Sequence, residues 1–369
     1  MNRHKGKRRK AQTAAACLAG LLSASACAQD SVTVYGIVDA AVARISNADA
    51  AGNAVTRMPS LTGSLPSRIG FRGEEALGGG LSAVFALEGG FGPDTGISGQ
   101  GGRLFGRQAW VGLKGGWGTL QLGRVMNMTY HGTAKSDVLG PSLFSISSID
   151  LYLPNARSDN ALAYMGKFKG WTVGASYSLG RDAASSGGAA ATNCPGEAAA
   201  DDKACRQVTA LLGYETDAFG INATYDRMRG GPGAANGLTG SGNTDRRVGV
   251  NAYVLLGRTK LGGGVIARTT KAAPGTTESD LFYLGVSHPL SANLTLDAQV
   301  ARKAVDASAD DSNLMAARLT YGFSKRTAVY GALGRMDNQG QAAIALDVGG
   351  TAAPGRTQNG VMAGLRHAF

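Results

Sequence analysis

After its first thirty residues, the sequence lacks any hydrophobic run long enough to form a membrane-spanning helix. It is also poor in charge, with 17% Asp, Glu, Lys and Arg, and poor in histidine, with 4 in 369 residues. Glycine is abundant at 56 residues, and 43% of the chain is apolar. This composition lies near the border between soluble and membrane proteins. A chain of this length forms either two ordinary domains or one large barrel.

Sequence motifs of enzymes and nucleic-acid-binding proteins are absent. The chain contains no G-x-S-x-G, H-E-x-x-H or Walker sequence, and its glycines are spread out instead of marking one phosphate-binding loop. No block of Lys and Arg follows Lys10, which argues against binding to nucleic acid. We therefore expect no catalytic residues, no metal and no cofactor. A hydrolase that uses His131 with a nearby serine remains an alternative.

The first 28 residues have the features of a secretory signal peptide. A basic cluster ending at Lys10 precedes an uncharged, largely apolar stretch up to Gln29, and Ala26-Cys27-Ala28 is an A-x-A-like cleavage site. We therefore predict that residues 1–28 are removed and that the protein is exported. Removal takes away six basic and no acidic residues, so 31 Lys and Arg and 26 Asp and Glu remain, a net charge of +5. A lipoprotein attached through Cys27 is the alternative, but Ala24 stands where such signals usually carry leucine.

Export also determines how the four cysteines are interpreted. Two belong to the predicted signal peptide, which leaves Cys194 and Cys205 in one polar segment rich in alanine and glycine. Disulfides form and persist in oxidising compartments, so we expect a disulfide within this loop. A metal site is the alternative, but no histidine lies nearby.

Polar and apolar residues alternate in many segments of about ten residues. From Trp171 to Leu179 every second residue is apolar, and the residues between them are threonine, glycine and serine. Segments that begin at Phe219 and Leu294 show the same pattern. A soluble β-sandwich would alternate as well, but the second face here carries small polar and charged residues that need water around them. The pattern therefore indicates strands of a membrane barrel with a water-filled interior.

Sixteen such segments follow one another after the predicted signal peptide. We place them at residues 31–44, 65–75, 80–90, 103–114, 117–124, 157–168, 170–180, 206–215, 218–228, 246–255, 259–268, 279–288, 292–303, 313–323, 326–336 and 358–369. Tight turns such as Gly115-Gly116 and Ser324-Lys325 alternate with longer polar loops, as expected for short periplasmic turns and long external loops. The predicted fold is all-β, a 16-stranded antiparallel transmembrane β-barrel over residues 29–369.

Several blocks of the sequence resemble one protein family. They are Ser31 to Asp39 (SVTVYGIVD), Ser67 to Leu81 (SRIGFRGEEALGGGL), Gly106 to Leu113 (GRQAWVGL), Arg157 to Tyr164 (RSDNALAY) and the terminal Phe369. Together they resemble the general diffusion porins of β-proteobacteria, over all of residues 29–369. The resemblance implies an outer-membrane channel for passive diffusion of small hydrophilic solutes and ions, surrounded by lipid and lipopolysaccharide. It also implies a homotrimer, with Phe369 as the recognition signal for the outer-membrane insertion machinery.

The resemblance further implies a third external loop that folds inward and narrows the pore. Here this loop covers about residues 125–156 and contains Asp137 and Asp150. Its length without a credible strand calls for a functional explanation. The acidic, phenylalanine-containing motif common in this loop of the family is not evident, and Gly140 to Phe144 is only a loose counterpart.

Parity along the strands predicts which charged residues face the lumen. Arg68 and Arg72 lie opposite Phe71, and Arg157 is placed in the lumen by the same argument. The resemblance supports Arg68, Arg107 and Arg157 as an arginine ladder on the wall facing the third loop. Arginines opposite carboxylates of that loop would create a transverse field that discriminates ions by charge. We therefore predict moderate anion selectivity. The alternative is that each charge is separately solvated and has little effect.

Arg107 and Asp39 need arguments of their own. Arg107 shares its parity with the apolar Val111, and we place it inward because Trp110 is the better lipid- or subunit-facing residue. Asp39 faces the lumen opposite Val38, and we expect it to pair with a charge on a neighbouring strand.

Assembly and alternative roles follow from the same interpretation. We expect the trimer contact around the first strands, where Asp39 to Ala43 are mostly small residues. A barrel that acts mainly as an adhesin or phage receptor is a further alternative, since long external loops suit either role.

Overall fold

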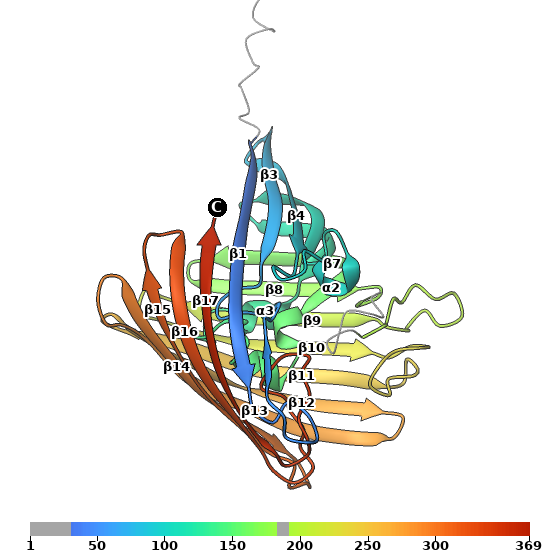
Figure 1. Ribbon diagram of the computed structural model, residues 1–369. Coiled ribbons are helices and arrows are strands. Elements are labelled where there is room, and N and C mark those ends of the chain that lie inside the picture. The colour runs from blue at the N-terminus through green and yellow to red at the C-terminus, as the bar shows by residue number, and fades with distance from the viewer. Residues whose placement is uncertain (1–30, 183–191) are drawn as a thin grey trace, which may run out of the picture.

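The computed structural model describes residues 31–182 and 192–369, which form a closed antiparallel barrel of sixteen long strands (Figure 1). The long strands are β1 (Ser31–Ile45), β3 (Arg68–Gly78), β4 (Leu81–Gly90), β5 (Gln108–Gly115), β6 (Gly118–Met126), β7 (Arg157–Phe168), β8 (Trp171–Ser178), β9 (Gln207–Glu215), β10 (Phe219–Arg229), β11 (Thr244–Leu256), β12 (Thr259–Ala272), β13 (Gly275–Pro289), β14 (Leu294–Val305), β15 (Ser312–Gly322), β16 (Thr327–Asn338) and β17 (Thr357–Ala368). The predicted signal peptide lies outside the described residues. No helix within the described ranges is long and apolar enough to cross a membrane.

The barrel closes between its first and last strands. One half of β1, from Ile37 to Ile45, pairs antiparallel with β17, and the other half pairs with β3. Backbone hydrogen bonds run in both directions between Gly36 and Phe369. The Phe369 ring covers Gly36, where a Cβ atom would come within 2.3 Å of the ring, so this crossing needs glycine. Each long strand in the described ranges therefore has two neighbours, so none of these strands leaves an edge open to lipid.

The two faces of the strands differ as the alternation predicted. Along β8, Trp171, Val173 and Tyr177 expose 50%, 40% and 46% of their surface, whereas Ser176 and Ser178 are buried. An apolar outer band around a polar interior is the arrangement that a membrane barrel requires. The predicted fold class is confirmed.

The predicted boundaries differ most from the structure at two places. β5 begins at Gln108, five residues later than predicted, because left-handed residues from Gln100 to Gly102 turn the preceding segment into a loop. A longer external loop is expected between β12 and β13, but these strands extend until Ala272 lies opposite Gly275. Threonine-rich segments on both sides of this turn continue the pairing, since β-branched residues favour strands. A short extra strand, β2 (Val55–Arg57), pairs with the end of β1.

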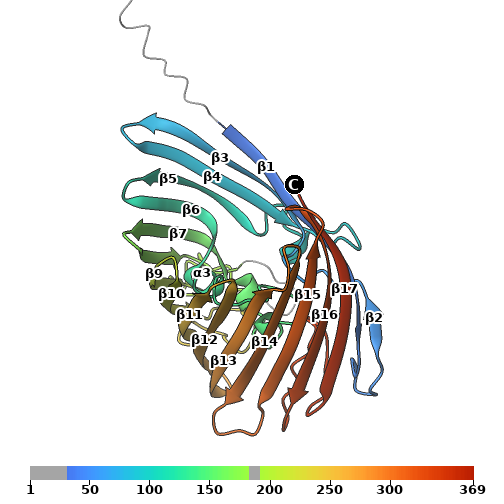
Figure 2. The same ribbon diagram turned by 90° about the vertical axis from the view of Figure 1, so that its left-hand side faces the viewer.

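Loop 3 (residues 127–156), the β1–β3 loop and the β16–β17 loop all contribute residues to one core inside the barrel, and Figure 2 shows α3 enclosed by the strands. Loop 3 contains α3 (Met128–Thr133), α4 (Ile146–Ile149) and the 3-10 helix η1 (Leu153–Asn155). Its side chains Leu143, Phe144 and Ile146 are buried against apolar residues of the inner wall. The end of the β1–β3 loop lies beside it, where the Leu143 amide donates to the Thr62 carbonyl at 2.8 Å. Apolar packing therefore holds loop 3 inside the lumen.

Candidate functional site

The three ladder arginines, Arg68, Arg107 and Arg157, meet on one wall of the lumen. Arg107 Nε donates to Glu88 Oε1 at 2.6 Å, and Arg68 Nε lies 3.4 Å from Glu88 Oε2. Arg157 is 1% exposed, donates to Asn155 Oδ1 at 3.0 Å and experiences the positive charge of Arg107. One carboxylate thus serves two guanidinium groups. Among the described residues, no carboxylate lies within salt-bridge distance of Arg157.

Arg107 reaches the lumen, but the argument from Trp110 is wrong. Val111 exposes 58% of its surface outward, whereas Trp110 is half-buried, packs near Val125 and donates to Gln108 Oε1 at 3.0 Å. Trp110 and Gln108 line the same inner cavity, so both face the lumen. Strict alternation fails here because Arg107 lies in a bend before β5 and points inward together with Gln108.

Arg72 lies on the same face of β3 as Arg68 but nearer the periplasmic turn at Gly79-Gly80. The four residues of strand that separate the two arginines correspond to about 13 Å. The Arg72 guanidinium stands over the Tyr35 ring, 5.2 Å from its centroid, in a cavity that His131 also lines. The structure therefore places Arg72 in the periplasmic vestibule, below the ladder.

Both loop 3 carboxylates are bound to a different part of the wall. Asp150 accepts two hydrogen bonds from Arg247 on β11, and Asp137 accepts one from Gln299 Nε2 on β14 at 2.8 Å. Neither carboxylate lies within salt-bridge distance of a ladder arginine. The carboxylate that does face the ladder is Glu88, which the sequence analysis missed. Alternation along β4 predicts that Glu88 faces inward, but it does not predict that Glu88 contacts Arg68 and Arg107.

The two loop 3 carboxylates differ in their ease of protonation. Burial raises the pKa of a carboxyl group, but at Asp150 the positive charges of Arg247 and Arg268 outweigh burial and hold the pKa below its usual range. Burial raises the pKa of Asp137 to about 6, because its hydrogen-bond partner, Gln299, is neutral. At weakly acidic pH the Asp150 carboxyl group of loop 3 is therefore ionised, whereas that of Asp137 is partly protonated.

Tyr152 fastens loop 3 at a third point that the sequence analysis did not identify. Its hydroxyl donates to Asp226 on β10 and accepts a hydrogen bond from Gln207 Nε2 on β9 at 2.7 Å. The Arg181 and Arg247 guanidinium groups lie 4.8 and 4.2 Å from the centroid of its ring. Burial raises the pKa of Tyr152, so the hydroxyl remains a donor across the physiological range.

Asp39 is held by hydroxyl groups, so the expectation of a charged partner is wrong. Its carboxylate accepts hydrogen bonds from Ser64 and Tyr330, and the residue is fully buried. In the part of the chain that the structure describes, no cation lies within salt-bridge distance of it. The reason is that the segment before β3 folds inward and brings Ser64 and Ser67 onto β1, where Ser67 Oγ accepts from the Asp39 amide at 2.9 Å.

A second group of ion pairs lies at the external ends of β5 to β8. Asp159 accepts from Arg124 and from Arg103 Nη2 at 3.2 Å, and Arg103 also contacts Asp182 at 2.8 Å. Parity does not predict the Arg124 contact, because the pairing of β6 with β7 shifts register between Gly123 and Val125. Such a bulge re-aims the neighbouring side chain.

Comparisons with known proteins agree with this arrangement. A family model described as Gram-negative porin matches residues 13–341. This chain is a Gram-negative porin. It is 31% identical over 372 residues to outer membrane porin protein 32 of Delftia acidovorans, covering 94% of this chain and 96% of that protein. It is 34% identical over 245 residues to an outer membrane porin protein of Bordetella pertussis, covering 62% of each.

Solved porin structures share the fold. The anion-selective porin from Comamonas acidovorans superposes with a TM-score of 0.75 at 26% identity, covering 92% of this chain and 100% of that one. OmpT of Vibrio cholerae in its trimer form superposes with a TM-score of 0.65 at 14% identity, which shows the fold alone. This porin lies in the outer membrane, where its barrel forms a water-filled channel for small hydrophilic solutes and ions.

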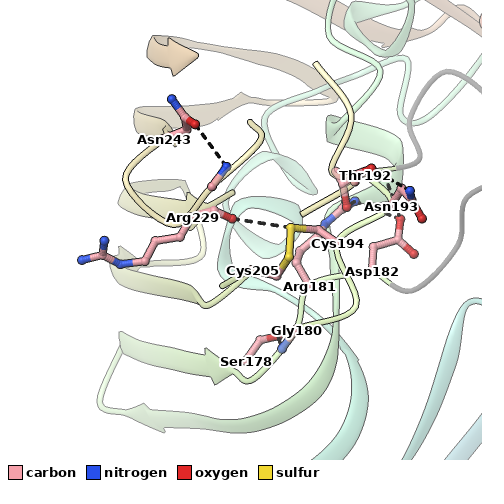
Figure 3. Close-up of a disulfide and its surroundings, with 12 residues drawn as sticks. Ser178, Gly180, Arg181, Asp182, Thr192, Asn193, Cys194, Cys205, Arg229 and Asn243 are labelled. Carbon is pink, nitrogen blue, oxygen red and sulfur yellow. Dashed lines mark hydrogen bonds and ion pairs between the residues drawn. A yellow bond between two sulfur atoms is a disulfide. The ribbon is translucent and has the colours of Figure 1, made fainter. Parts of the chain in front are cut away.

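The porin carries the expected disulfide between Cys194 and Cys205, in its β8–β9 loop (Figure 3). The two Cα atoms are 5.2 Å apart, and both side chains are buried with Met228 and Leu238. The Cys205 amide donates to the Gly230 carbonyl at 2.9 Å. The bridge thus closes one external loop, and the hydrogen bond from Cys205 holds that loop against the base of the next.

Proposed function

We propose that this porin favours anions, because its inner wall carries unneutralised arginines where loop 3 narrows the lumen. The observation that carries the proposal is the charge balance of the ladder. Arg68 and Arg107 share Glu88, and Arg157 has no carboxylate within salt-bridge distance among the described residues. Asp150, which could offset this charge, is itself paired with Arg247. Low-dielectric walls strengthen the field of such charges on a passing ion.

The similar fold of the anion-selective porin from Comamonas acidovorans supports the proposal. The net charge of +5 after signal removal adds little, because charges more than about 10 Å from the ion path are screened at physiological salt. The charges of the ladder arginines therefore affect ion selectivity more than the net charge of the chain does.

Zero-current potentials across a salt gradient in planar bilayers test the proposal. We expect Arg157→Ala to lower the anion-to-cation permeability ratio, and Arg68→Ala/Arg157→Ala to lower it further, by about two- to fivefold for each arginine removed. A unit charge at 4 Å is worth about 1 kcal/mol in water, which sets this scale. Arg335→Ala is the matched control, since this outward arginine is paired with Asp337. A wild type that prefers cations, or correctly folded variants with unchanged potentials, would contradict the proposal.

We infer further that the porin is a homotrimer and acts as a channel, not as an enzyme. The relatives named above are porins, and OmpT of Vibrio cholerae, which shares the fold, has a trimer form. On β1, Val38 and Val42 expose 40% and 51% of their surface on the outer face beside Ala40, which suits contact between protomers. Native mass spectrometry in mild detergent distinguishes trimer from monomer. A stable, conducting monomer would refute the trimer.

We keep Phe369 as the proposed signal for the insertion machinery. Its ring is on the outer surface with 45% exposed and covers Gly36. Phe369→Ala should reduce the amount of protein that reaches the outer membrane without blocking refolding in detergent, because the closing backbone hydrogen bonds with Gly36 remain. Equal amounts of variant and wild type in the outer membrane would contradict the role of Phe369 as an insertion signal.

A further inference from the structure

The outer surface of the barrel carries a cleft with three basic side chains at the external ends of β10 to β13. This basic cleft is lined by Arg227, Arg246 and Lys271 together with Tyr225, Thr244, Thr269 and Glu278. The three cations are solvent-exposed. Their inward neighbours on the same strands, Asp226 and Arg247, are already engaged with loop 3, so the cleft has no part in the pore.

The height of the basic cleft matches the outer rim of the membrane. Directly below it on the same strands, Ile221, Val248 and Val250 expose 47%, 43% and 45% of their surface, as lipid-facing residues do. Arg246 lies two residues from Val248, or about 7 Å along the strand. The cleft therefore lies where the apolar band ends and lipid headgroups begin.

The charges within the basic cleft are not balanced by the protein. Arg227 lies directly opposite Arg246 in the ladder of β10 and β11, and like charges in this position destabilise a sheet. Arg246 donates to Thr269 Oγ1 at 3.2 Å, and Thr269 reaches Glu278 at 3.4 Å. Among the residues described, no carboxylate lies within salt-bridge distance of Arg227, Arg246 or Lys271. Three cations thus share one nearby carboxylate.

Two other outward arginines near the same rim, Arg302 and Arg335, do have carboxylate partners. Arg302 contacts Asp311 at 2.7 Å, and Arg335 contacts Asp337 at 2.8 Å. At these two positions the chain itself supplies the neutralising carboxylate. The unpaired cations of the basic cleft need an anion from outside the protein.

We propose that the basic cleft binds the phosphate groups of a phosphorylated lipid in the outer leaflet. Arginine presents a planar fork of donors that matches phosphate oxygens, and two such forks face each other here. The apolar surface below the cleft would contact the acyl chains of the same lipid, which favours a lipid over a soluble phosphate. The cleft is also far along the sheet from β1, so it stays open to lipid when protomers meet there.

Native mass spectrometry of the folded protein in detergent micelles tests the proposal. The protein is titrated with diphosphorylated lipid A, with its dephosphorylated form and with phosphatidylethanolamine. We expect the wild type to bind the diphosphorylated lipid most tightly. Each basic residue removed should weaken binding about fivefold, so Arg227→Gln/Arg246→Gln should lose about 25-fold and Lys271→Gln about fivefold. Arg302→Gln/Arg335→Gln is the matched control and should bind as the wild type does.

Three results would overturn the proposal. The first is equal binding by the wild type and the Arg227→Gln/Arg246→Gln variant. The second is equal binding of the phosphorylated and dephosphorylated lipids. The third is displacement of the lipid by millimolar orthophosphate, which would make the ligand a soluble anion. Heat-modifiable mobility in gels verifies that each variant is folded before titration.

Discussion

Asp150 of loop 3 and Arg247 of β11 are joined by two hydrogen bonds, from Nε to Oδ2 at 2.9 Å and from Nη2 to Oδ1 at 3.2 Å. Both side chains are largely buried, at 14% and 6% exposed. A bidentate contact fixes orientation as well as distance. Together with the contact of Tyr152 with Asp226, it determines how far this part of loop 3 stands from the wall.

Breaking this pair should loosen loop 3. Removing one partner of a buried ion pair costs about 3–5 kcal/mol, because it leaves an uncompensated charge. We expect Arg247→Gln to give larger and noisier single-channel currents than the wild type, whereas Arg302→Gln on the outer surface should change neither. The double variant Asp150→Asn/Arg247→Gln should be less disturbed than Arg247→Gln alone. Currents of wild-type size and noise in Arg247→Gln would show that the pair does not hold the loop.

Glu88→Gln should raise anion preference. It removes the carboxylate that Arg68 and Arg107 share, so the ladder gains one net positive charge. The expected change is about a two- to fivefold higher anion-to-cation permeability ratio, on the scale of one charge near the ion path. Glu74→Gln is the control, because Glu74 is exposed and pairs with Lys114 in the vestibule. An anion-to-cation permeability ratio that is lower in Glu88→Gln than in Glu74→Gln would contradict this role of Glu88.

Selectivity should depend on pH through Asp137. With a pKa of about 6, its carboxyl group is ionised above that pH and neutral below it. Acidification from pH 7.5 to pH 5 therefore removes one negative charge from loop 3 and should raise anion preference. Asp150 stays ionised over this range, since its pKa is lowered. Reversal potentials at both pH values should change less in Asp137→Asn. A full pH response in that variant would assign the titration to another group. His131 would not be that group, because burial lowers its pKa to about 4.

The disulfide should matter to its loop more than to the barrel. Closing a loop of this size is worth about 3 kcal/mol, but Cys194 and Cys205 join two points of one external loop and not two strands. We expect Cys194→Ala/Cys205→Ala to keep a melting temperature close to that of the wild type and to be cut faster by protease in the β8–β9 loop. Intact-mass analysis after alkylation without reductant should find no free thiol in the wild type. Two alkylated thiols would disprove the bridge in the isolated protein.

Alternation of residue types was enough to predict the strands. The outward face of β8 follows from a period of two, which is a local property of the chain. The closure of β1 on β17 follows from the even number of strands, which brings both ends of the chain to the same side of the barrel. Parity failed where the backbone departs from that period. The bend at Arg107 and the register shift beside Arg124 both redirect arginines that simple counting misplaces.

The partners inside the lumen were beyond sequence reasoning for a different reason. Tyr152 and Asp226 are 74 residues apart, and Asp150 and Arg247 are 97 apart. Alternation shows that Asp226 and Arg247 point inward, but which side chain of loop 3 meets each of them depends on how the loop packs. Apolar contacts of Phe144 and Ile146 with the wall set that packing, and they have no repeating pattern in the sequence.

The hydrogen bond from Tyr330 to Asp39 spans 291 residues and constrains the order of events during biogenesis. Arg318 likewise reaches back to the carbonyls of Gly63 and Leu139, the latter at 3.0 Å. Both donors belong to strands translated near the end of the chain, whereas the segments that they hold are translated early. The inner loops can therefore adopt their final conformation only after the last strands have been added to the barrel. A chain halted before β15 would contain most of the strands of the barrel. It would lack the contacts of Arg318 and Tyr330 that hold the inner loops and so fix the width of the channel.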